Sequence, residues 1–115
     1  MAIGFIGLGR MGGGMARNLV KTVSPLFVYD PRAAAMASLA DAGATSCASA
    51  AQVAERCDTI FLCLPFAPEV RAALFGPDGI AARARDGLTI IDTTTLDRLD
   101  AIEIAKAAAD SGIAY

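Results

Sequence analysis

The sequence has no histidine, no tryptophan and only three cysteines among its 115 residues. Without histidine, a Ser-His-Asp triad and a histidine general base are excluded. The cysteines are Cys47, Cys57 and Cys63, and no two of them have the C-x-x-C spacing. We therefore expect reduced thiols that pack as small hydrophobic side chains, and neither a metal site nor a disulfide.

Basic charge and long apolar runs are scarce as well. The net charge is −2, the pI is about 4.9 and no cluster of Lys or Arg occurs, so nucleic acid is not an expected partner. The longest apolar run, from Ile60 to Phe66, is too short to cross a bilayer, and no charged leader precedes the first apolar run. We expect no membrane partner and a cytoplasmic location.

What the sequence does contain is an alternation of short apolar runs with segments of helical periodicity. Predicted strands are 3–6, 26–29, 44–46, 59–64 and 88–92. Predicted helices are 11–20, 31–42, 50–56, 68–75, 78–84 and 98–111, and 113–115 opens a further strand. In the last helix, Leu99, Ile102, Ala105 and Ala109 fall along one face. This order predicts a Rossmann-type, doubly wound parallel sheet with strand order 3-2-1-4-5, incomplete at its last strand.

A glycine-rich turn follows the first predicted strand. Gly7, Leu8, Gly9, Arg10, Met11 and Gly12 fit G-x-G-x-x-G, the dinucleotide fingerprint. Gly7 permits a tight turn, Gly9 lets the backbone approach a pyrophosphate, and Gly12 lets helix and strand pack closely. The free N–H groups of the following helix then face the phosphates.

Asp30 ends the second predicted strand, eighteen residues after Gly12. At this separation an acid accepts hydrogen bonds from the adenosine ribose, and its charge repels a 2′-phosphate. We therefore expect NAD as cofactor, while Arg32 leaves NADP open.

Other polar and apolar side chains near strand ends have two interpretations each. The run Thr93–Thr95 suits either a ligand contact or a strand end with a helix-capping hydroxyl. Asp92 suits either a ligand contact or a hydrogen bond to a neighbouring turn. Phe66, Pro68 and Val70 either border the adenine or pack a strand–helix connection.

Residues 5–12, followed by 15–19, resemble the N-terminal signature of the β-hydroxyacid dehydrogenases, which include 3-hydroxyisobutyrate dehydrogenase, tartronate semialdehyde reductase and 6-phosphogluconate dehydrogenase. Segments 58–65, 75–80 and 91–95 are similar to further segments of that family. Two departures are Thr94, where the family usually has Ser, and Arg98, where it has Pro.

The resemblance implies roles for individual residues. The backbone around Leu8–Met11 would hold the pyrophosphate and Asp30 the ribose. Leu64 and Pro65 would line the adenosine side, Thr95 would approach the nicotinamide, and Thr94 with Thr95 would border the substrate.

The resemblance also implies that residues 1–115 are an incomplete dinucleotide-binding domain. The family continues into a helical domain that carries a catalytic lysine, whereas Lys21 and Lys106, the lysines of this sequence, lie away from the strands' carboxyl ends. We expect the 115-residue chain to bind a cofactor without turnover. The parent protein would transfer hydride between nicotinamide and a small 3-hydroxy acid or semialdehyde, and we expect a homo-oligomer. Because strand 88–92 lacks most of its next neighbour, we expect the 115-residue chain by itself to self-associate through this edge, or its C-terminal helix to pack imperfectly.

Three alternatives stay open. The first is a self-contained, non-catalytic nucleotide-binding module. The second is the cofactor domain of an imine reductase. The third, a methyltransferase-like domain that binds S-adenosylmethionine, is disfavoured by the spacing of Gly12 and the helix entry.

Overall fold

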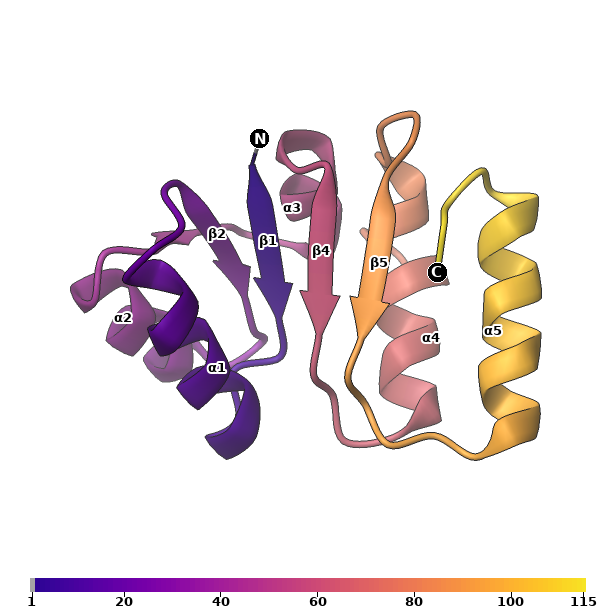
Figure 1. The fold of residues 1–115 in the computed structure, drawn as a ribbon, viewed down its shortest axis with the longest axis horizontal. Helices are drawn as coiled ribbons and strands as arrows, with labels where there is room; N and C mark the ends of the chain where they lie inside the picture. Colours follow the sequence, from indigo (N-terminus) through magenta and orange to yellow (C-terminus); the bar gives the residue numbers. More distant parts are fainter. Residues whose placement is uncertain (1) are drawn as a thin grey trace.

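Five parallel strands form one sheet in the computed structural model, which describes residues 2–115 (Figure 1). The strands are β1 (Ile3–Ile6), β2 (Leu26–Tyr29), β3 (Thr45–Ser46), β4 (Thr59–Leu62) and β5 (Thr89–Asp92). They lie in the order β3-β2-β1-β4-β5, and every neighbouring pair is parallel. The predicted fold class and strand order are confirmed.

Helices cover the sheet in two layers, each with its own core. The helices are α1 (Arg10–Val20), α2 (Ala33–Asp41), α3 (Ala50–Arg56), α4 (Ala67–Phe75) and α5 (Arg98–Asp110), with a 3-10 turn η1 (Ile80–Ala82). Helices α1 and α2 pack on one face of the sheet, and α3, α4, η1 and α5 pack on the other.

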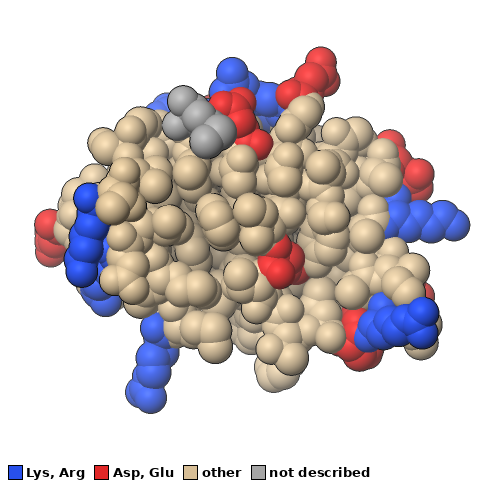
Figure 2. Space-filling view, in the orientation of Figure 1, with Lys and Arg blue, Asp and Glu red and all other residues tan. Residues whose placement is uncertain are grey.

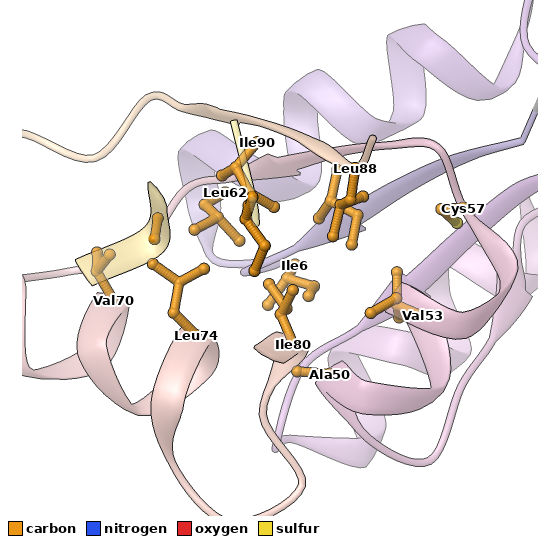
Figure 3. Packing of buried hydrophobic residues seen from close by; sticks show 14 of the residues in the cluster. Ile6, Ala50, Val53, Cys57, Leu62, Val70, Leu74, Ile80, Leu88 and Ile90 are labelled. Atoms are coloured by element: carbon orange, nitrogen blue, oxygen red, sulfur yellow. The ribbon is translucent and has the colours of Figure 1, made fainter. Parts of the chain in front are cut away.

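Alternate residues of the inner strands supply these two cores. Phe5 faces α1 and α2 and stacks on Phe61, with ring centroids 6.0 Å apart. Its neighbour Ile6 points to the opposite core, where Ile80 packs near Leu74 (Figure 3). Both faces of β1 and β4 are therefore apolar, which is why these strands read as continuous hydrophobic runs.

The sheet is less well covered at β5. In Figure 1 the helices of residues 2–115 leave the front of β4 and β5 open, and in the same orientation Figure 2 shows this face to be mostly uncharged. Ile91 on β5 is accordingly 43% exposed. Within residues 2–115, the outer edge of β5 pairs only with Ala114, which donates to the Leu88 carbonyl and accepts from the Ile90 N–H. This bridge is the predicted opening of a further strand.

The face of α5 that packs on the core is not the one that carries Leu99 and Ile102. The face that carries Leu99 and Ile102 points away from the sheet, and these side chains are 72% and 52% exposed. Ile104 and Ala108 are buried instead. The many alanines of this helix give a weak apolar periodicity, so the buried face is selected by contact with α4 and the sheet.

Boundaries differ slightly elsewhere. Strand β4 ends at Leu62, two residues before its predicted end, and the N–H and the hydroxyl of Thr93 both donate to the Leu62 carbonyl, at 2.8 and 2.7 Å. The predicted helix 78–84 is only the three-residue turn η1. No helix within residues 2–115 combines the length and the hydropathy that crossing a membrane requires.

We expect Ser49→Ala to lower the free energy of unfolding by about 1 kcal/mol. The Ser49 hydroxyl oxygen accepts from the Gln52 N–H at 3.1 Å, and the Gln52 side-chain oxygen accepts from the Ala48 N–H at 2.6 Å, an arrangement close to a capping box. Urea denaturation followed by circular dichroism measures the change. Ser111→Ala, at the exposed C-cap of α5, is the control and should change little.

Candidate dinucleotide-binding site

The carboxyl ends of the strands converge at the lower edge of the sheet in Figure 1. The turn after β1, the segment after β2 and the loops after β4 and β5 all meet there. The chain reverses direction across the sheet between β1 and β4, which makes this the topological switch point. Ligands of open α/β sheets bind at such a point.

Two glycines let the first turn close against α1. Gly7 has φ of +100°, and a Cβ on it would lie 2.1 Å from the Cys63 carbonyl oxygen. A Cβ on Gly12 would lie 2.0 Å from the Gly7 carbonyl oxygen. Both positions therefore require glycine, and the N-terminus of α1 is held directly over the turn, as the fingerprint predicts.

The first turn of α1 is open to a ligand. The N–H groups of Arg10, Met11 and Gly12 have no intrahelical acceptor, because they lie in the first turn of the helix. The N-cap residue is Gly9, so no side chain at the N-cap accepts from them either. The nearest atom to a Cβ on Gly9 would be Nη2 of Arg32, 3.7 Å away. Bare amides and a guanidinium thus surround one small region that suits an anion.

Asp30 is buried, and each of its carboxylate oxygens accepts two hydrogen bonds. Its carboxylate accepts from the Leu8 N–H at 2.8 Å, from the Arg32 N–H and Nε at 2.9 Å each, and from Arg32 Nη2 at 3.1 Å. Burial alone would raise the pKa of Asp30, but the Arg32 side chain and these N–H groups hold that pKa below its usual value. Four donors use all of the carboxylate's acceptor positions, so a ribose hydroxyl needs Arg32 to move.

A crevice of about 420 Å³ lies in front of this pair. It is lined by Gly7, Gly9, Met11, Gly12, Asp30, Pro31, Arg32, Cys63, Leu64, Pro65 and Glu69. Most of the residues that the sequence predicts to bind a cofactor are therefore brought together. Leu8 and Arg10 line a neighbouring cavity instead, and the exposed Thr95 lines none of the cavities described in residues 2–115.

The neighbouring cavity, of about 310 Å³ between α1 and α2, is rich in arginine. Arg10, Arg17 and Arg32 line it, and Arg17 donates to the hydroxyl of Ser38. Arg32 and Gly9 line both this cavity and the crevice, so Arg32 stands between them. Arg17 and Ser38 were missed from the sequence, because nothing local predicts that α1 and α2 face each other here.

A third cavity, of about 380 Å³, lies between the start of α3 and helix α4. It is lined by Ile6, Tyr29, Pro31, Ala48, Ser49, Ala50, Leu64, Glu69, Ala72, Ala73, Pro77 and Asp78. Pro31, Leu64 and Glu69 line the crevice as well, so the two spaces adjoin each other. Glu69 was also missed, although its place in the first helical turn after Leu64-Pro65 is a usable signal.

For Val70, Phe66 and Asp92 the sequence allowed either a ligand contact or a structural role, and the structure shows the surroundings of each. Val70 is fully buried in the core, whereas Phe66 is 69% exposed. Asp92 accepts from the Thr94 N–H at 2.9 Å and from the Tyr115 hydroxyl, and burial followed by this last contact raises the pKa of Tyr115. These contacts give Asp92 a structural role.

Thr94 connects two of the loops that border the site. Its hydroxyl oxygen accepts from the Leu64 N–H at 2.9 Å, across thirty residues of sequence. The loop after β5 is thereby fixed to the loop after β4, beside the crevice. One lone pair of Thr94 is used in this bond, and its O–H is left to donate to a bound molecule.

The cysteines and acidic side chains of residues 2–115 do not form a metal site. Cys47 and Cys57 are buried free thiols, and burial raises the pKa of Cys57 to about 12. Within residues 2–115, no three His, Cys, Asp or Glu side chains are grouped closely enough to hold a metal ion.

Fold and site together define a dinucleotide-binding domain of the Rossmann type. The family described as the NAD binding domain of 6-phosphogluconate dehydrogenase matches residues 2–115. The chain belongs to this family, and its predicted membership of the NAD-binding part of the β-hydroxyacid dehydrogenases is confirmed.

Curated relatives agree with this assignment. The chain is 37% identical over 113 residues to 2-(hydroxymethyl)glutarate dehydrogenase of Eubacterium barkeri, covering 98% of the chain and 38% of that protein. It is 38% identical over 113 residues to human mitochondrial 3-hydroxyisobutyrate dehydrogenase, covering 98% of the chain and 34% of that protein. The chain thus spans little more than a third of these relatives.

Solved structures share the fold. Mycobacterium tuberculosis 3-hydroxyisobutyrate dehydrogenase superimposes with a TM-score of 0.91 at 30% identity, over 98% of this chain and 38% of that one. An imine reductase from Myxococcus stipitatus in complex with NADP+ matches with a TM-score of 0.88 at 22% identity, over 100% of this chain and 39% of that one. At that identity the second likeness shows the fold alone.

Proposed function

We propose that this domain binds NAD across the carboxyl edge of its sheet. The pyrophosphate lies on the free N–H groups at the start of α1, and the adenosine extends past Asp30 and Leu64. The observation that carries this proposal is the close approach of α1 to the Gly7 turn, which only glycine at position 12 permits. A bare helix N-terminus at the switch point suits a diphosphate.

In this proposal the ribose displaces Arg32 from Asp30. The carboxylate then accepts from the ribose hydroxyls. The Arg32 side chain, which is already 63% exposed, moves its guanidinium toward solvent or toward a phosphate. The cavity lined by Arg10, Arg17 and Arg32 supports NADP as the alternative cofactor, because guanidinium groups suit a 2′-phosphate.

Calorimetric titration of the domain with NAD and with NADP tests the proposal. We expect saturable binding of NAD with one site per chain and weaker binding of NADP, since Asp30 retains its negative charge. Heat changes that do not saturate with either dinucleotide would contradict the assignment of this site.

For the enzyme that contains this domain, we propose hydride transfer between nicotinamide and a small 3-hydroxy acid or its semialdehyde. Support comes from the relatives, two of which are named as dehydrogenases of hydroxy acids. The bound cofactor supplies the hydride chemistry. Thr94 and Thr95, at the end of β5, lie at the sheet edge where the nicotinamide and the substrate would meet.

The proton must come from elsewhere in that enzyme. Lys21 is the C-cap of α1 and Lys106 lies in the second half of α5, so both are remote from the strands' carboxyl ends. We therefore propose that residues 2–115 bind cofactor without turnover, and that a helical domain supplies the acid–base group.

We also propose a homo-oligomer and a cytoplasmic location. The open outer edge of β5 and the exposed Ile91 support association. The buried free thiols of Cys47 and Cys57 suit a reducing compartment. The human relative is named as mitochondrial.

A further inference from the structure

The cavity between α3 and α4 has a polarity that limits what it can hold. Most of its lining is apolar, with Ile6 and Leu64 from the strand ends and Ala72 and Ala73 from α4. Its charged side chains are both carboxylates, Glu69 and Asp78, and no Lys or Arg lines it. Ligand pockets of this kind take a flat apolar group that carries a few donors.

Glu69 and Asp78, both exposed residues, differ in their relation to the crevice. Glu69 lines both the cavity and the crevice, so it lies where the two meet. Asp78 lines the cavity alone, together with Pro77, and therefore lies beyond the junction. A group that enters from the ribose position passes Glu69 first and meets Asp78 with its far edge.

Local structure holds Asp78 in place. Its φ is +55°, in the left-handed region, and its carbonyl accepts from the Ala51 N–H at 2.9 Å, which fixes it to the start of α3. A tight turn follows, in which the Gly79 N–H donates to the Gly76 carbonyl at 2.9 Å. No hydrogen bond or ion pair within residues 2–115 engages the Asp78 carboxylate, so its acceptor positions are available.

We propose that Asp78 reads the adenine base of the cofactor by accepting a hydrogen bond from its exocyclic 6-amino group. This inference rests on the proposed dinucleotide site and adds base selection to it. Adenine places that amine opposite its bond to the ribose, and so at the end of the cavity where Asp78 lies. A 6-oxo base places a carbonyl oxygen there, and two sets of lone pairs then repel each other.

The test compares NAD with nicotinamide hypoxanthine dinucleotide, in which the 6-amino group is replaced by oxygen. Calorimetric titration of the wild-type domain should show about tenfold tighter binding of NAD, as expected for one hydrogen bond to a charged acceptor. In Asp78→Asn the preference should fall to within about twofold, because an amide can donate to the 6-oxo group as well as accept from the amine.

Asp78→Asn is a conservative change, because asparagine adopts the left-handed backbone region more readily than other residues. Its Tm should therefore equal that of the wild type. Asp110→Asn, at the exposed end of α5, removes one negative charge far from the cavity and should leave the tenfold preference intact.

Equal wild-type affinity for the two dinucleotides would overturn this inference and leave the proposed function standing. A preference that persists in Asp78→Asn would also overturn it. Failure of both dinucleotides to bind would overturn the proposed function and this inference with it.

Discussion

Gly12→Ala should lower the free energy of unfolding of this domain by about 3 kcal/mol or more. The new Cβ would lie 2.0 Å from the Gly7 carbonyl oxygen and 3.2 Å from the Cys63 Cβ. The first of these neighbours is backbone, so no rotamer change relieves the contact. Helix α1 must move away from the turn, and the Phe5 core beneath it opens.

Gly14→Ala, two residues further along the same helix, is the matched control. Gly14 is exposed, and a Cβ there would meet no atom within 4 Å. Alanine is the better helix former, so this variant should be more stable than the wild type by about 0.5–1 kcal/mol. Urea denaturation of both variants measures the difference. Equal midpoints for the two variants would contradict the close packing of α1 on the turn.

The second large effect concerns the dinucleotide preference, which Asp30 and Arg32 should control in opposite directions. Asp30→Ala removes the acceptor for the ribose and frees Arg32, so NAD should bind at least tenfold more weakly and NADP more strongly. Arg32→Ala frees two of the four occupied acceptor positions of Asp30, those used by Nε and Nη2, and keeps the bond from the backbone N–H of residue 32. NAD should then bind several-fold more tightly, and NADP more weakly.

Calorimetric titration of both variants with both dinucleotides measures these changes. Asp30→Ala carries a cost in stability, since the Leu8 N–H loses its partner, which is worth about 1–3 kcal/mol. Binding is therefore compared below the Tm of each variant. An unchanged ratio of NAD to NADP affinity in both variants would remove this pair from cofactor selection.

The pH dependence of stability gives an independent readout of Asp30. Its pKa is lower in the folded state than the usual 3.8, so it stabilises the fold above that value. The contribution is lost as the pH falls through the folded-state pKa. Asp30→Ala should accordingly lose less stability than the wild type on acidification.

Much of the fold could be predicted because its signals act over a few residues. Ser49 and Gln52 are three apart, and Gly43 and Gly112 end their helices with φ of +112° and +75°. The strand order followed from the alternation of strands and helices, which is typical of a doubly wound sheet. The buried face of α5 could not be predicted, because its alanines suit either side and the choice depends on α4.

The candidate site shows the same division. The glycines and the acid at the end of β2 were placed by spacing, and they do lie together. The contacts that decide their chemistry join distant residues: Leu8 with Asp30, Arg17 with Ser38 and Leu64 with Thr94. The periodicity of apolar residues in the sequence does not predict which distant residues form such hydrogen bonds.

The sequence by itself determined the order of the elements, the turn that needs glycine and the family, because backbone geometry and side-chain period are local properties. Only the tertiary structure decided that the Leu8 N–H donates to Asp30, and that Glu69 and Asp78 line one cavity. Those arrangements depend on how separate strand ends and helices are packed, which is a property of the whole sheet.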